Sequence, residues 1–239
     1  MTEEIRNQSG ERLDYTYHGF PSATTVVVIG HGVTGNKDRP HLIALAEAVV
    51  QAGMAAIRLS FSGCGDSEGD FGMSTPSKQV GDLRSVLDAL KDRKTFYVGH
   101  SLGGAVGVIT ASADQRIRAL VTLGCVVDLA RFADTEFGNV TPGQGGMWDD
   151  PNYPLSEQFM NDMRTLGSIA TLAPSVKVPW LLVHGTDDDV VPIQDSIDAF
   201  ETAGVGRKLV RMEGADHVFS DDAGAEMVGT VVDWLRSHN

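Results

Sequence analysis

The stretch TFYVGHSLGGAVGVITA, residues 95–111, changes from one structural pattern to another within a few residues. It opens with aromatic and β-branched residues, which favour a buried strand, and ends in small and apolar residues with a helical pattern. Between the two, GHSLG at residues 99–103 matches G-x-S-x-G, in which a serine occupies a sharp strand-to-helix turn. This order predicts that the hydroxyl of Ser101 lies at the edge of a sheet, placed to act as a nucleophile.

A second stretch, GDSEG at residues 65–69, matches the same pattern. It lies in a segment rich in glycine and aspartate, and no helical pattern follows it before Pro76. Such a composition is typical of a turn. We therefore predict that Ser101 is the nucleophile and that Ser67 has a structural role.

Strand-like and helix-like segments alternate along most of the chain. The strand patterns cover residues 24–30, 54–60, 94–100, 117–124, 178–185 and 207–214. The helical patterns cover residues 40–53, 76–92, 101–113, 193–204 and 223–238. This alternation predicts an α/β fold with a mostly parallel sheet and helices on both faces, as a single domain over residues 1–239. Residues 3–19 predict a hairpin around Ser9 and Gly10 that adds antiparallel strands at one edge.

The alternation is interrupted at residues 125–178. Residues 133–154 are rich in Gly, Pro, Asn and Asp, and residues 155–173 have a helical pattern. A long irregular stretch inside a compact domain is often functional, so we predict a small cap inserted between two strands. Its large side chains either line an aromatic pocket or pack the cap onto the core: Phe132, Phe137, Met147, Trp148, Tyr153 and Phe159.

A serine nucleophile needs a base, and the base needs a carboxylate to orient it. In a fold of this type they follow in the order serine, acid, histidine, so the histidine lies late in the chain. Only His217 and His238 lie beyond the strand that follows the cap and the acidic loop after it. His238 is the penultimate residue, whereas His217 follows a predicted strand. We predict His217 as the base.

The acid is less well defined. The stretch HGTDDDVVP, residues 184–192, contains Asp187, Asp188 and Asp189 directly after a strand. All three are expected near the carboxyl edge of the sheet, and spacing alone does not choose among them. The other two aspartates would then be solvated loop charges or helix caps.

Acyl transfer also requires backbone N–H groups that stabilise an oxyanion. One candidate is the N–H of Leu102, directly after the nucleophile. The other is the N–H of Val33 in HGVTG, residues 31–35, where Gly32 lets the chain turn. We expect His31 to have a structural, hydrogen-bonding role.

Composition narrows the classes of partner. The formal net charge is −13, which disfavours nucleic acid and anionic membranes. No apolar run long enough for a membrane span occurs, and the first ten residues, MTEEIRNQSG, do not resemble a signal peptide, so we expect a cytoplasmic location. The two cysteines, Cys64 and Cys125, are expected to be buried thiols.

Four histidines, at positions 31, 100, 184 and 217, follow predicted strands, but none of the usual metal-ligand spacings occurs. We therefore expect neither a metal nor a cofactor. The expected partner is a small-molecule ester. The sequence leaves the oligomeric state open, a homodimer included.

The motifs resemble those of the α/β-hydrolases over nearly the whole chain. A closer resemblance is to small bacterial cinnamoyl and feruloyl esterases, in HGVTGNK (31–37), GHSLGG (99–104), HGTDDDVV (184–191) and EGADHVFSD (213–221). The resemblance implies that the acid is Asp188, at the fifth position of an H-G-x-x-D stretch. It also implies that Val33 and Leu102 donate to the oxyanion and that the cap shapes the substrate pocket.

The leading hypothesis is a serine carboxylesterase for short-chain or aromatic acyl esters, including cinnamoyl and feruloyl esters, that works through a Ser101–His217–Asp188 triad. A related acyl-transfer enzyme (thioesterase, peptidase, perhydrolase or acyltransferase) fits the same residues, because the pocket decides the reaction. A hydrolase-fold binding protein without turnover is a third alternative.

Overall fold

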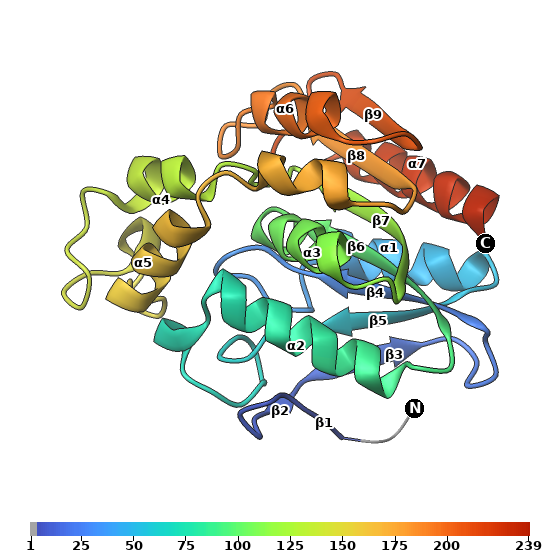
Figure 1. Cartoon of the computed structure of the whole chain (residues 1–239), viewed down its shortest axis with the longest axis horizontal. Coiled ribbons are helices and arrows are strands. Elements are labelled where there is room, and N and C mark those ends of the chain that lie inside the picture. The colour runs from blue at the N-terminus through green and yellow to red at the C-terminus, as the bar shows by residue number, and fades with distance from the viewer. Residues whose placement is uncertain (1–3) are drawn as a thin grey trace.

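The computed structural model describes residues 4–239 (Figure 1). Residues 1–3, with which the polar N-terminal stretch begins, lie outside the described part. The main sheet has seven strands in the order β3-β5-β4-β6-β7-β8-β9. Its strands are β3 (Tyr15–His18), β4 (Thr25–Gly30), β5 (Ala55–Leu59), β6 (Lys94–His100), β7 (Ile117–Leu123), β8 (Trp180–Gly185) and β9 (Arg207–Met212). Only β3 is antiparallel to its neighbour, which confirms the predicted α/β fold with a mostly parallel sheet.

The N-terminal hairpin forms but does not widen the main sheet as expected. β1 (Ile5–Arg6) and β2 (Arg12–Leu13) pair in a separate two-stranded sheet, and only β3 joins the large one. The reason is that the backbone of Arg12 is already engaged: its N–H donates to the Glu68 carboxylate at 2.8 Å, and its carbonyl accepts from the Glu68 N–H at 2.8 Å.

Helices cover both faces of the sheet, in two separate packing layers. The major helices are α1 (Pro40–Gln51), α2 (Pro76–Ala89), α3 (Leu102–Ala113), α6 (Gln194–Thr202) and α7 (Asp222–His238). α1 and α7 pack on the face to which Val27 and Ile29 of β4 point, and α2, α3 and α6 pack on the face of Val26 and Val28 (Figure 1). Both faces of the strands are therefore buried, which explains their continuous apolar runs.

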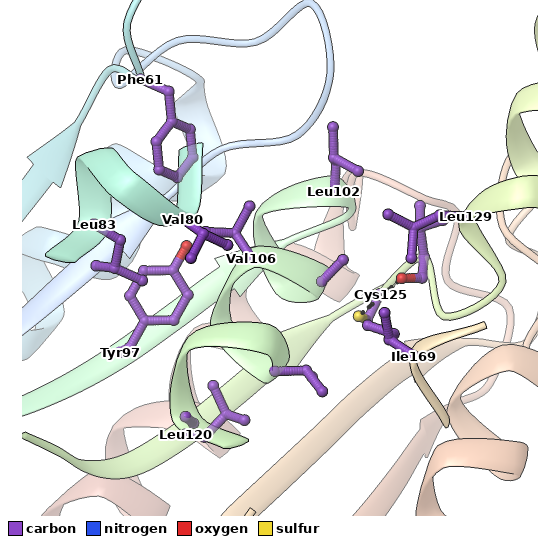
Figure 2. Close-up of a cluster of buried hydrophobic side chains, with 14 of the residues drawn as sticks. Phe61, Val80, Leu83, Tyr97, Leu102, Val106, Leu120, Cys125, Leu129 and Ile169 are labelled. Atoms are coloured by element: carbon purple, nitrogen blue, oxygen red, sulfur yellow. Dashed lines mark hydrogen bonds between the residues drawn. The ribbon is translucent and has the colours of Figure 1, made fainter. Parts of the chain in front are cut away.

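The core beneath α3 fixes the turn that carries Ser101 (Figure 2). The ring of Tyr97 is fully buried, and its hydroxyl donates to the carbonyl of Gly103 at 2.9 Å. A Cβ at Gly107 would lie 2.6 Å from that ring, so the absent side chain lets α3 pack closely on β6. Burial and this hydrogen bond together hold the start of α3 against the end of β6.

The chain between β7 and β8, residues 124–179, contains α4 (Leu129–Phe137), α5 (Glu157–Leu166) and the 3₁₀ helices η2 (Met147–Asp149) and η3 (Ile169–Ser175). The prediction that irregular structure begins at residue 133 is wrong, because α4 continues to Phe137; Asp128 caps it by accepting from Arg131 N–H at 3.0 Å. The predicted helix over 155–173 is divided at Gly167, whose φ of 59° ends α5. A further 3₁₀ turn, η1 (Phe71–Met73), follows the Ser67 loop.

Both cysteines are buried and unpaired, as predicted. Burial raises the pKa of Cys64 to about 11, so its thiol is protonated at neutral pH. Among residues 4–239, no helix combines the length and the hydrophobicity needed to cross a bilayer.

Candidate active site

Ser101 lies between β6 and α3 in a strained backbone conformation, with φ 55° and ψ −120°. Its N–H donates to the carbonyl of Leu123 on the adjacent strand at 2.8 Å. The turn is possible because its glycines lack side chains: a Cβ at Gly99 would lie 2.2 Å from the Gly103 carbonyl oxygen. A non-glycine residue keeps such a conformation only where its surroundings enforce it, which is common at functional sites.

A cavity of about 930 Å³ opens at this turn. Ser101 and His217 both line it, together with the loop after β4, the start of α1, the loop after β9 and the start of α7. Its volume falls in the usual range for small-molecule sites. Ser101 and His217 therefore line one open cavity, although they lie more than a hundred residues apart in the sequence.

The imidazole of His217 is held by a buried carboxylate. Nδ1 of His217 donates to Oδ2 of Asp188 at 2.8 Å. The other oxygen of Asp188 accepts from the N–H groups of Val190 and Val191 at 3.0 and 2.7 Å. Burial on its own would raise the pKa of Asp188, but hydrogen bonds from His184 and His217 reverse the effect and hold the pKa well below its ordinary value. Asp188 is thus ionised at neutral pH and fixes which nitrogen of His217 carries a proton.

The neighbouring aspartates do not reach His217. Asp187 accepts a hydrogen bond from the Thr186 hydroxyl at 3.3 Å, and within residues 4–239 the carboxylate that contacts His217 Nδ1 is that of Asp188 and not that of Asp189. Gly124, at the end of β7, is what gives the pair room: a Cβ there would lie 3.1 Å from Asp188 Oδ2 and 3.3 Å from His217 Nδ1. The three predicted alternatives thus separate in space, with Asp188 alone beside the imidazole.

The hydroxyl of Ser101 makes no hydrogen bond to another residue in the described range 4–239. It lies beside Gly32, where a Cβ would approach Ser101 Oγ to 3.2 Å. The next residue, Val33, lines the cavity, and Leu102 begins α3 with no acceptor for its N–H among the described residues. Leu102 thus follows Ser101 directly in the chain, and Val33 follows Gly32, which lies against Ser101.

His31 ties this loop to the rest of the fold, in agreement with its predicted structural role. Its Nδ1 donates to the Gly32 carbonyl at 2.8 Å, and its Nε2 accepts from the Phe61 N–H at 3.0 Å. Complete burial lowers the pKa of His31 to about 4, so the ring is neutral and can both donate and accept.

Backbone strain is concentrated around the cavity. Six non-glycine residues between positions 4 and 239 have a positive φ: Thr34, Ser101, Trp148, Asp149, Phe219 and Asp221. All except Asp149 line the cavity. Such conformations cost about 1–3 kcal/mol each and persist where the fold enforces them, so their gathering around one space marks it as a functional region.

Two further histidines, which sequence reasoning did not assign to the site, form edge-on and tilted ring contacts next to His217. His100 lies 4.8 Å from the His217 ring and 4.6 Å from the His41 ring, measured between centroids. Its Nε2 donates to the His217 carbonyl at 2.8 Å. Burial lowers the pKa of His41 to about 4 and that of His100 well below its usual value, so both rings pack as neutral groups. The position of His100 in GHSLG was the available signal; nothing local marked His41.

Asp195, on α6, is another residue that the sequence did not reveal. Its buried carboxylate accepts from the N–H groups of Val127 and Asp128 at 2.7 and 3.0 Å and pairs with Arg131. Burial raises its pKa despite these bonds. Asp195 therefore anchors the start of the 124–179 segment to α6.

The aromatic residues of the 124–179 segment mostly pack against one another. Phe137 contacts the rings of Phe132, Trp148 and Phe159, with centroids 5.9, 5.0 and 6.1 Å away. Of the six large side chains named from the sequence, only Trp148 lines the cavity with Ser101. Its Nε1 donates to Glu136 at 2.8 Å, and 44% of the residue is exposed.

No group of three or more His, Cys, Asp or Glu side chains within residues 4–239 is arranged to hold a metal ion. The nitrogens of His184, for example, contact the Ser196 hydroxyl at 2.7 Å and the Val191 carbonyl at 2.9 Å.

The sheet order, the strained serine turn and the late histidine are features of one fold class. A family model described as "alpha/beta hydrolase fold" matches residues 25–166, more than half of the chain, and the chain belongs to this family. Palmitoyl-protein thioesterase ABHD10, mitochondrial, of Bos taurus is 26% identical over 216 residues, which cover 85% of this chain and 70% of that protein.

Two solved structures show the same fold. The structure of ferulic acid bound to Est1E from Butyrivibrio proteoclasticus matches with a TM-score of 0.89 at 22% identity, over 99% of each chain. The alpha/beta hydrolase domain-containing protein 10 from mouse matches with a TM-score of 0.83 at 21% identity, also over 99% of each chain. The resemblance predicted from the motifs is thereby confirmed for the fold.

Proposed function

We propose that this chain is a serine carboxylesterase for small esters, with Ser101 as nucleophile, His217 as base and Asp188 as the orienting acid. The observation that carries the proposal is that a serine with a strained backbone and an unbonded hydroxyl shares a cavity with an imidazole held by a buried carboxylate. Each group is of the right type for its role, and their order in the chain matches the family pattern.

In the proposed mechanism, Ser101 Oγ attacks the ester carbonyl carbon while its proton passes to Nε2 of His217. Asp188 accepts the Nδ1–H bond and stabilises the imidazolium that forms. The oxyanion accepts hydrogen bonds from the N–H groups of Val33 and Leu102. Collapse of the intermediate breaks the bond to the alcohol, which takes the proton from His217. Water then hydrolyses the acyl-enzyme with His217 again as base.

We also propose that the 124–179 segment acts as a cap. Trp148 supports this role, because it reaches the cavity from that segment. A single indole on the cavity supports a substrate with a flat apolar group, the aromatic part of the preference expected from the sequence. The feruloyl part of the hypothesis rests on the likeness to the ferulic-acid-bound structure.

A thioesterase is the second candidate, supported by the relative named as a palmitoyl-protein thioesterase. The same nucleophile and base serve esters and thioesters. The experiment is to measure kcat/KM for ester and thioester pairs with the same acyl group, from acetyl to hexanoyl and cinnamoyl. An initial burst of released alcohol or thiol would support an acyl-enzyme. If the folded protein hydrolysed none of these esters and thioesters, both candidate functions would be contradicted.

A further inference from the structure

The cavity extends away from the 124–179 segment. From Ser101 it continues along the loop after His217 and between the N-terminal turns of α1 and α7. These two helices pack on the same face of the sheet through their buried residues (Figure 1). At the cavity they present Pro40, His41 and Ala44 from α1 and Gly224, Ala225 and Val228 from α7. We call this part the α1–α7 groove.

The groove is uncharged and mostly apolar: apart from His41, whose pKa burial lowers to about 4, the two helices line it with Pro40 and with small or apolar side chains. Ala44 and Ala225 are both exposed, so their methyl groups face the open space rather than the core. The charged residues on the cavity, Arg39 and Asp221, precede the helices instead of lying on these turns. In a chain with 51 charged residues among 239, an uncharged strip beside a candidate nucleophile favours an apolar ligand group.

The site geometry indicates which part of the substrate, the acyl group or the leaving group, lies along the groove. The carbonyl oxygen of a substrate points to the N–H groups of Val33 and Leu102, and the leaving atom lies against His217, which protonates it. The wall of the groove begins with the residue after His217 and continues through Phe219 into α7. The leaving group is therefore the part of the substrate that extends along this wall.

We propose that the α1–α7 groove binds the apolar alcohol or thiol portion of the substrate and selects for its length. This inference rests on the proposed function and adds the class of leaving group. Burying one methylene group raises a binding constant by up to about fourfold. Esters of longer alkyl alcohols should therefore react with a higher kcat/KM than esters of short ones.

The test compares ethyl, butyl and hexyl acetate by pH-stat titration, with the ratio of kcat/KM for hexyl over ethyl acetate as the readout. Ala225→Phe and Ala44→Phe fill the groove from opposite helices at exposed positions, so neither disturbs the core. We expect each to lower the ratio by about tenfold. Glu226→Phe and Glu47→Phe place the same ring on the same helices outside the groove and should keep the wild-type ratio.

The possible results distinguish a failure of the groove proposal from a failure of the proposed function. Two results would contradict the proposed role of the groove but leave the esterase proposal in place. One is wild-type turnover with a hexyl-to-ethyl ratio of kcat/KM near one. The other is a high ratio that Ala225→Phe and Ala44→Phe leave unchanged. A length dependence on the acyl side, measured with p-nitrophenyl acetate to octanoate and removed by Ala225→Phe, would overturn the assignment to the leaving group. No turnover on any ester would overturn both.

Discussion

The two G-x-S-x-G loops have matching sequence patterns and different structures. The hydroxyl of Ser67 donates to the Ser60 carbonyl at 2.8 Å and accepts from the Asp14 N–H at 2.7 Å, so it joins two segments of the chain. The hydroxyl of Ser101 makes no hydrogen bond to a described residue and faces the cavity, on a backbone with φ 55°. A serine becomes available for chemistry when the fold satisfies its backbone and leaves its hydroxyl free.

The largest expected difference between the loops is in activity. Ser101→Ala should lower kcat by about 10⁴-fold or more, because it removes the nucleophile. Ser67→Ala should keep kcat near the wild-type value but lower the free energy of unfolding by about 1–3 kcal/mol, since it leaves a buried carbonyl and N–H without a partner. Ester turnover and urea unfolding of both variants test this. Comparable losses of activity would contradict the comparison.

The second prediction concerns the acid. Asp188→Asn should lower kcat by about 10³- to 10⁴-fold, because an amide can present a donor to Nδ1 and favour the wrong tautomer of His217. Asp187→Asn and Asp189→Asn remove the same charge from the same loop and should have much smaller effects. Steady-state kinetics of the three variants decides the matter. Equal losses would show that the loop charge matters and the Nδ1 contact does not.

The third prediction concerns His31, which joins the loop next to Ser101 to Phe61 at the start of the Ser67 loop. Its folded-state pKa of about 4 lies below the ordinary value of 6.5. Between these pH values the unfolded chain binds a proton that the folded chain does not, so stability falls as the pH falls from 6.5 to 4. The full difference corresponds to about 3 kcal/mol.

His31→Gln should reduce this dependence, and leave the part that His41 and His100 contribute, when urea unfolding is compared at pH 7.5 and pH 4.5. His238→Gln, at the end of α7, makes the same change far from both loops and should keep the wild-type dependence. An unchanged slope in His31→Gln would show that other groups cause the acid sensitivity.

The fourth prediction concerns Gly124. Gly124→Ala places a methyl group against Asp188 and His217 on a backbone with a positive φ. We expect kcat to fall by about 10- to 100-fold through displacement of the imidazole. Gly143→Ala is the matched control, because Gly143 also has a positive φ but open space around it. It should lose a similar amount of stability and little activity.

The smallest expected effect is that of backbone strain on the free energy of unfolding. At position 101, glycine should be more stable than alanine by about 1 kcal/mol, because the positive φ penalises a Cβ. At position 67, where φ is not positive, alanine should be the more stable of the two by about 0.5–1 kcal/mol. Unfolding of Ser101→Gly, Ser101→Ala, Ser67→Gly and Ser67→Ala measures both differences, and the same sign at both positions would contradict the strain argument.

Much of the fold was predictable because its signals are local. Buried parallel strands appear as continuous apolar runs, and the strand–turn–helix around Ser101 lies within 17 residues. The N-terminal hairpin was predicted less well, since its pairing depends on the distant Glu68.

The site was only partly predictable, because it depends on directions in space. Three adjacent aspartates give equal signals in the sequence, and only the path of the loop after β8 turns Asp188 toward His217. The α1–α7 groove had no local signal in the sequence. Ala44 and Ala225 are ordinary helix residues, and they form a groove only because the two helices pack side by side. The aromatic residues of the 124–179 segment gave a strong signal, yet most of them pack against one another.

The most direct test of the central claim is labelling with a fluorophosphonate, followed by intact mass and peptide mapping. The account predicts one adduct, on the peptide that contains Ser101, and its loss in the variant His217→Ala. An adduct on the Ser67 peptide, or a folded protein that is not labelled, would contradict it.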